Sequence, residues 1–204
     1  MMAVTTRDRI LDSARDLVLR QGFSATTVDA VLASAGSSKG AFFHHFPSKA
    51  ALGRALVERY SEADARTLDE ALTAVEQEED DPGRQLIAFV RAFEEVADEV
   101  LEAPPACLFV SFIYESELGD EETAQIVAGS ILHWRERLLA KLEEAAAARP
   151  GFPPVDLPSL ADHVFTVMEG GFLLVRALDD PTRMRAQLAH LRHYLELLFG
   201  EPVS

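Results

Sequence analysis

The sequence predicts an all-α fold, with a small helical domain over residues 1–47 and a larger one over residues 48–204. Apolar residues recur with the 3.6-residue period of an amphipathic helix along nearly the whole chain, and no segment alternates convincingly as a β-strand does. Apolar residues make up 48% of the 204, enough to bury a sizeable core. Proline and glycine punctuate the pattern into nine helices, three in the first domain and six in the second.

The first two helices are short and have recognisable ends. The first carries one apolar stripe and stops near Gly22. The second opens at Thr26, whose hydroxyl can cap it, with Asp29 three residues on in the capping-box position. Gly36 suits the left-handed position just past its end. The stripe of the first helix consists of Ile10, Leu11, Ala14, Leu17 and Val18.

The third helix, roughly 38–45, is expected to begin at a serine cap, Ser37 or Ser38, and to end before Pro47. Ser48 then caps a long fourth helix that runs to about residue 75.

Five further helices are expected in the larger domain. An acidic run over 76–81 followed by Pro82-Gly83 indicates the loop before them, and Pro104-Pro105 opens the second of the five. A connector over 149–158 holds four prolines and a glycine, and Pro181 separates the last two helices. The five are expected at about 84–102, 105–117, 121–148, 157–179 and 182–199.

The charge is distributed unevenly along the chain. The formal net charge is −15, which by itself argues against a nucleic-acid partner. Residues 1–60, however, hold eight basic and five acidic side chains, a net charge of +3, and the remainder of the chain carries −18. A polyanion would therefore be attracted by residues 1–60 and repelled by the remainder of the chain.

Several classes of protein are excluded by what the sequence lacks. One cysteine rules out an internal disulfide, no apolar run reaches 18 residues, and no signal-peptide pattern opens the chain. We expect a cytoplasmic protein with no membrane partner. The sequence carries none of the common hydrolase, metalloprotease, phosphate-loop or dinucleotide motifs, so we expect no enzyme, no catalytic residue, no cofactor and no metal.

Residues 26–46 have the spacing of a helix-turn-helix. Two short amphipathic helices are joined by the tight turn Ala35-Gly36-Ser37, and the second of them would enter the major groove of DNA. The side chains at the N-terminal end of this second helix are small or basic, with Lys39 among them, and those at its C-terminal end are mostly aromatic. Such an N-terminal end permits close approach to DNA.

The stretch TTVDAVLASAGSSKGAFFHHFPSKAAL resembles the DNA-binding signature of the tetracycline-repressor (TetR) family along its whole length. The resemblance implies a nine-helix dimeric repressor whose larger domain binds an inducer. It also implies, position by position, a set of DNA contacts with Lys49 on a phosphate. This set is Thr27, Ser37, Ser38, Lys39, Gly40, Ala41, Phe43, His44, His45 and Lys49.

Two positions in this stretch depart from the family pattern. Many relatives have tyrosine where this chain has Phe43, so that a phosphate-binding hydroxyl is missing, and many have glutamate in place of Ala50. Helical spacing places Phe42 and Phe46 on one side, which favours the core for both.

The stretch MEGGFLLVRALDD, residues 168–180, resembles the penultimate helix in one broad branch of the family. In that branch the last two helices of each subunit form a four-helix bundle, which implies a homodimer; burial within one subunit is the alternative. Gly170 and Gly171 in mid-helix suggest close backbone approach across the dimer or room for a ligand. The expected interface consists of Phe172, Val175, Leu178, Leu188, Leu191, Leu195 and Leu198.

Aromatic side chains in the middle helices suggest an apolar ligand cavity, although a plain hydrophobic core explains each of them singly. We expect a mainly hydrophobic inducer. Cys107 follows Pro104-Pro105 and is either a thiol sensor or an inert buried cysteine. The expected pocket consists of Phe89, Phe93, Cys107, Phe109, Phe112, Trp134, Phe165, Met168 and Phe172.

These observations predict a homodimeric repressor that binds a palindromic double-stranded DNA operator and is released by a small-molecule inducer. A ligand-dependent activator and a nucleoid-type binder without a ligand share the same helix-turn-helix. The size of the second domain argues against the nucleoid-type binder, because DNA binding and dimerisation alone need far fewer residues.

Overall fold

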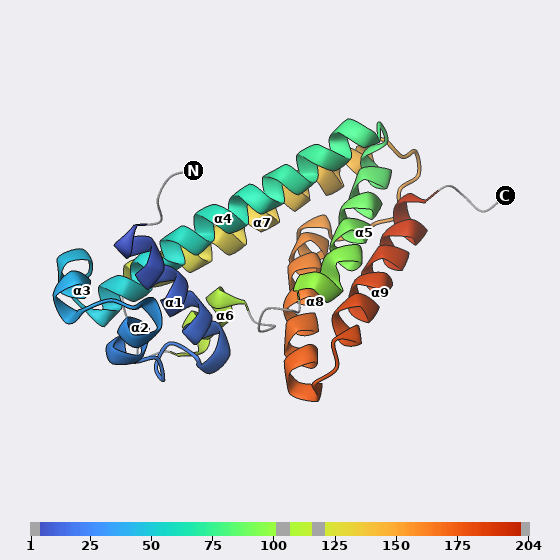
Figure 1. Cartoon of the computed structure of the whole chain (residues 1–204). Helices are drawn as coiled ribbons and strands as arrows, with labels where there is room; N and C mark the ends of the chain where they lie inside the picture. The colour runs from blue at the N-terminus through green and yellow to red at the C-terminus, as the bar shows by residue number, and fades with distance from the viewer. Residues whose placement is uncertain (1–4, 101–106, 116–120, 201–204) are drawn as a thin grey trace. The chain divides into compact units, whose positions relative to one another are not determined.

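The computed structural model describes residues 5–100, 107–115 and 121–200, and all the regular structure in these ranges is α-helical (Figure 1). Nine helices lie in them, as the sequence predicts. They are α1 (Thr6–Gln21), α2 (Val28–Ala35), α3 (Lys39–His45), α4 (Lys49–Glu78), α5 (Pro82–Val100), α6 (Leu108–Tyr114), α7 (Glu121–Ala147), α8 (Leu157–Leu178) and α9 (Thr182–Phe199).

The chain forms two compact units, each assembled from two stretches of sequence. The first comprises residues 1–63 and 106–129, and the second comprises 64–105 and 130–204. Both α4 and α7 therefore contribute to both units. The functional division that the sequence suggests at residue 47 stays a prediction.

Four helix ends differ from the sequence prediction. Helix α4 runs to Glu78, into the acidic run that is expected to be a loop. The cap of α2 is Thr27, whose hydroxyl accepts the Ala30 N–H, whereas the Thr26 hydroxyl donates to the Gly22 carbonyl at 2.7 Å. Pro82 begins α5 instead of a loop, because proline is well suited to the first turn of a helix. The sixth helix begins at Leu108, while Pro104, Pro105 and the expected end at 116–117 lie outside the described residues.

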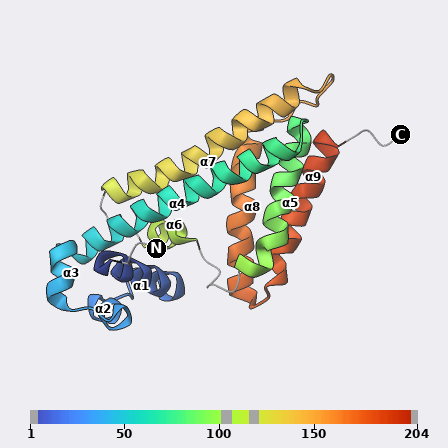
Figure 2. The same ribbon diagram turned by 45° about the horizontal axis from the view of Figure 1, so that its top comes forward.

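In the first unit, α1 packs against α2, α3 and α6 (Figure 2). A reciprocal capping box between Thr5 and Asp8 starts α1, and the hydrogen bonds from Thr5 lower the pKa of the Asp8 carboxyl. The aromatic rings of Phe42 and Phe46 are buried, as helical spacing predicts. The buried face of α1 consists of Ile10, Leu11, Ala14, Val18 and Leu19.

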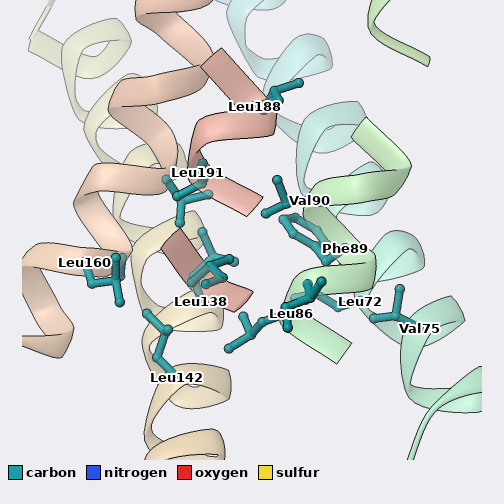
Figure 3. Packing of buried hydrophobic residues seen from close by; sticks show 14 of the residues in the cluster. Leu72, Val75, Leu86, Phe89, Val90, Leu138, Leu142, Leu160, Leu188 and Leu191 are labelled. Carbon is teal, nitrogen blue, oxygen red and sulfur yellow. The ribbon is translucent and has the colours of Figure 1, made fainter. Parts of the chain in front are cut away.

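In the second unit, α9 packs along both α5 and α8. Figure 3 shows the core that results, with leucines of α7, α8 and α9 meeting Phe89 and Val90 of α5. The apolar stripe of α9, which includes Leu188, Leu191 and Leu195, points into this core. The leucines at a 3–4 spacing on α9 therefore pack into the core of their own chain.

The two adjacent glycines of α8 have different surroundings. A Cβ built on Gly171 would overlap the Met184 sulfur of α9, whereas nothing lies within 4 Å of one built on Gly170. Gly171 thus permits the close packing of α8 on α9 within one chain, which the sequence reading did not consider. No helix among the described residues has the length and apolarity needed to cross a membrane.

Candidate DNA-binding surface

The turn between α2 and α3 is held by backbone geometry. Gly36 ends α2 in the left-handed conformation, with φ of 59°, and the Ser37 N–H donates to the Leu32 carbonyl at 3.0 Å. Ser38 then caps α3 by accepting the Ala41 N–H at 3.2 Å. Of the two serines that the sequence offers as caps, Ser38 is the one used.

Helix α3 has one buried and one exposed side. The Phe42 ring is fully buried, at 0% exposure, and contacts the Phe46 ring at 5.7 Å between centroids. Phe43 points away from the core and is 58% exposed. Burial of the first two rings therefore fixes which face of the helix meets solvent.

The ten predicted DNA contacts lie in α3, in the turn before it and at the starts of α2 and α4, and none of them is buried. Six of them are exposed and four are half-buried. The exposed ones are Thr27, Ser38, Lys39, Gly40, Phe43 and His44, and the half-buried ones are Ser37, Ala41, His45 and Lys49. None of the ten is committed to the apolar core, so this face is available to a partner.

Lys39 is accessible and weakly held. Its ammonium lies 3.0 Å from a carboxylate oxygen of Asp29, with 69% of the lysine side chain and 72% of the aspartate side chain exposed. An ion pair this exposed contributes little, because water screens it and both side chains lose rotamer freedom. A DNA phosphate or a guanine edge would compete with Asp29 for this lysine.

Lys49, at the start of α4, is more restrained. Its Nζ donates to the Ser24 carbonyl at 3.0 Å and lies 4.7 Å from the centre of the Phe23 ring. Burial lowers the pKa of the Lys49 ammonium, and the Glu115 carboxylate opposes that shift. An ammonium has three N–H donors, so the bond to Ser24 leaves capacity for a phosphate.

Glu115, just after α6, binds the turn between α1 and α2. One carboxylate oxygen accepts the Phe23 N–H at 2.9 Å and the other accepts the Ser24 N–H. Gly22 makes room for this carboxylate, since a Cβ built there would overlap it, and its φ of 85° favours glycine. The residue is 92 positions from Phe23, and no local sequence signal indicates the contact.

Two family models match this chain. "Bacterial regulatory proteins, tetR family" covers residues 10–56, and "Tetracyclin repressor-like, C-terminal domain" covers residues 82–191, more than half of the chain. This chain belongs to the TetR family. It is a transcriptional regulator with a DNA-binding helix-turn-helix, and the all-helical fold expected from the resemblance is confirmed.

Individual TetR-family proteins extend the likeness over the rest of the chain. The transcriptional regulator AcuR of Cereibacter sphaeroides is 28% identical over 156 residues, 75% of this chain and 68% of AcuR. The repressor NemR of Escherichia coli is 37% identical over 71 residues, which span 35% of this chain and 36% of NemR. The crystal structure of the reduced form of NemR superposes with a TM-score of 0.78 at 21% identity, covering 98% of this chain and 99% of that one, and shows the shared fold.

The residues predicted to line a pocket fall into two groups. Phe89, Phe93, Trp134 and Phe165 contact one another in the second unit, and Met168 and Phe172 pack against the same core. Cys107, Phe109 and Phe112 belong to the first unit, where Phe109 contacts Tyr60 and Phe112 contacts Phe23. Cys107 is buried at the N-cap of α6. The described contacts therefore bring together the six predicted pocket residues of the second unit and leave the other three in the first unit.

The residues predicted for a dimer interface also divide. Val175, Leu188, Leu191 and Leu195 are buried within this chain, at 5% exposure or less. For these four residues the structure agrees with the alternative, burial within one subunit. Phe172 and Leu198 are half-buried, and Leu178 is 56% exposed. Sequence reasoning passed over Leu173 and Leu197, which are 67% and 73% exposed. Their exposure depends on how α8 and α9 rotate against α5, which periodicity alone does not define.

Proposed function

We propose that this TetR-family protein is a homodimeric transcriptional repressor in the cytoplasm, which binds a palindromic operator and is released from it by a small, mainly hydrophobic inducer. One observation carries the DNA-binding part: α3 buries Phe42 and leaves Ser38, Lys39 and Gly40 exposed at its leading edge. A helix of this kind can enter the major groove with small side chains and one cation foremost.

The homodimer is supported by an apolar surface on α8 and α9. Leu173 on α8 and Tyr194 and Leu197 on α9 are exposed large side chains. Exposed apolar surface of this size is typical of interaction sites. Gly170 lies one helical turn before Leu173 and has nothing within 4 Å of a built Cβ. A mid-helix glycine costs about 1 kcal/mol relative to alanine, and the approach of a partner helix would offset that cost.

In the proposed mechanism, two α3 helices sit about one DNA turn apart and read successive major grooves. An inducer held in the second domain prefers a conformation whose α3 spacing no longer fits the operator. It needs to prefer that conformation by only a few kcal/mol to release the DNA. The relative NemR is named a transcriptional repressor, and this favours repression over activation as the function of this protein.

The DNA-binding part is tested by alanine variants of the two lysines. Lys39→Ala and Lys49→Ala are each expected to weaken binding to a duplex selected by the wild-type protein, and Lys49→Ala is expected to lower the salt dependence by about one phosphate contact. Arg185→Ala, on the exposed face of α9, is the matched control and should bind as the wild type does. Unchanged affinity in both lysine variants would contradict the proposed docking.

A further inference from the structure

The second unit contains a cluster of four aromatic rings, in which three phenylalanines surround Trp134. The indole lies 6.4 Å from Phe89, 6.2 Å from Phe93 and 6.4 Å from Phe165, measured between ring centroids. Trp134 and Phe89 are buried, whereas Phe93 of α5 and Phe165 of α8 are half-buried. The cluster thus has a buried floor and a partly exposed rim.

A carboxylate lies against this aromatic cluster. Asp64 of α4 accepts the Trp134 indole N–H on Oδ2 at 2.6 Å. No other hydrogen bond and no ion pair reaches Asp64 within the described part of the chain, where the nearby charges Asp69 and Arg137 pair with each other at 2.8 Å. His133, the neighbouring titratable group, lies 3.7 Å from Asp69.

An acid without a cationic partner is costly at this position. Burial raises the pKa of the Asp64 carboxyl, against the hydrogen bond from Trp134 and the charge of His133. A neutral asparagine would satisfy the indole N–H equally well and without that cost. The carboxylate therefore offers something that orienting Trp134 does not need, which is a negative charge without an ion pair at the edge of the indole, beside the aromatic cluster.

We propose that Asp64 and the rings of Phe93, Trp134 and Phe165 form a receptor for an apolar organic cation. Aromatic faces attract such a cation through their quadrupoles, and a desolvated carboxylate compensates its charge. The half-buried rings, Phe93 and Phe165, turn to admit it. The inference rests on the proposed ligand-responsive function and names the class of ligand that the second unit accepts.

The test uses the intrinsic fluorescence of the full chain, because Trp134 is its single tryptophan and reports on this site alone. The purified protein is titrated with tetraphenylphosphonium and, separately, with tetraphenylborate, which have nearly the same size and shape and opposite charge. We expect a saturable change in emission with the cation at a Kd at least tenfold below that of the anion. Equal affinity for the two ions, or no saturable change with the cation, would overturn the proposal.

Variants separate a specific receptor from general apolar binding. Asp64→Asn keeps an acceptor for the indole N–H and should lose at least tenfold in cation affinity and the preference over the anion. Phe93→Leu should lose severalfold, and Glu62→Gln, at an exposed acid of the same helix as Asp64, should bind as the wild type does. Unchanged cation affinity in both Asp64→Asn and Phe93→Leu contradicts the inference. Because no DNA is present, failure here leaves DNA binding standing, and failure to bind DNA leaves this result standing.

Discussion

The backbone N–H of Phe23 donates to the carboxylate of Glu115 at 2.9 Å, a contact that joins the end of α6 to the turn after α1. The same carboxylate accepts the Ser24 N–H, and the Ser24 carbonyl in turn accepts from Lys49. One acidic side chain thereby restrains the turn that holds a predicted phosphate contact.

Replacing Glu115 by alanine should destabilise the first unit. Two backbone N–H groups lose a charged acceptor, and the cost is about 1–3 kcal/mol in the free energy of unfolding. Hydrogen exchange at the amides of Phe23 and Ser24 should accelerate in parallel. Glu58→Ala, at an exposed glutamate of α4, is the control and should change neither quantity. Unaltered exchange at both amides in Glu115→Ala would show that the carboxylate does not hold this turn.

Two glycine-to-alanine substitutions in helices should have opposite effects. A Cβ on Gly53 of α4 would lie 2.7 Å from the Phe23 ring and 3.3 Å from Phe112, so Gly53→Ala should destabilise by about 1–3 kcal/mol through overpacking. Gly129 of α7 has nothing within 4 Å of a built Cβ, and Gly129→Ala should stabilise by up to about 1 kcal/mol through helix propensity. Urea unfolding measures both. The same sign for the two variants would contradict the packing of Phe23 and Phe112 on α4.

The exposed leucines of α8 and α9 predict a dimer that one charge disrupts. Wild-type protein should sediment at twice the 22.4 kDa mass of a single chain, and Leu197→Glu should sediment as a monomer, because a carboxylate would be buried at the interface. Leu132→Glu introduces the same charge at a leucine of α7 that is 49% exposed, and should remain dimeric. A dimer that survives both Leu197→Glu and Leu173→Glu would place the interface elsewhere.

The carboxyl of Asp64 predicts a pH dependence of stability. Burial raises its pKa in the folded chain, whereas the unfolded chain has the ordinary value of about 3.9. Between the two values the folded state binds more protons, so this group makes the free energy of unfolding fall as pH rises, and its effect is constant above the folded pKa. Asp64→Asn should therefore be more stable than the wild type at pH 7, with the difference shrinking as pH falls through that window. A difference independent of pH would contradict the shift.

Much of the fold could be predicted from sequence because its signals are local. Helix period, the αL glycine at Gly36 and the proline stops depend on residues a few positions apart, and they account for the nine helices. The cap of α2 is less predictable, because Thr26 and Thr27 offer the same hydroxyl and only the path of the chain decides that Thr27 is the cap.

The candidate sites were only partly predictable. The α3 surface follows from a contiguous motif, whereas Glu115 on Phe23 and Asp64 on Trp134 join residues 92 and 70 positions apart. Periodicity also indicates that one stripe of α9 is apolar, but it does not indicate whether helices of the same chain or of a partner chain cover that stripe. The structure shows that α5 and α8 of the same chain cover Leu188, Leu191 and Leu195.

Reading of DNA by a dimer through α3 is tested by selecting bound sequences from a pool of random duplex DNA with the purified full chain, at stated salt. A palindrome with half-sites about one helical turn apart is expected, with weaker enrichment for Lys39→Ala under the same conditions. Enrichment of no sequence by the wild-type protein at any salt tried, or of a single half-site without symmetry, would contradict a dimeric repressor that reads DNA through α3.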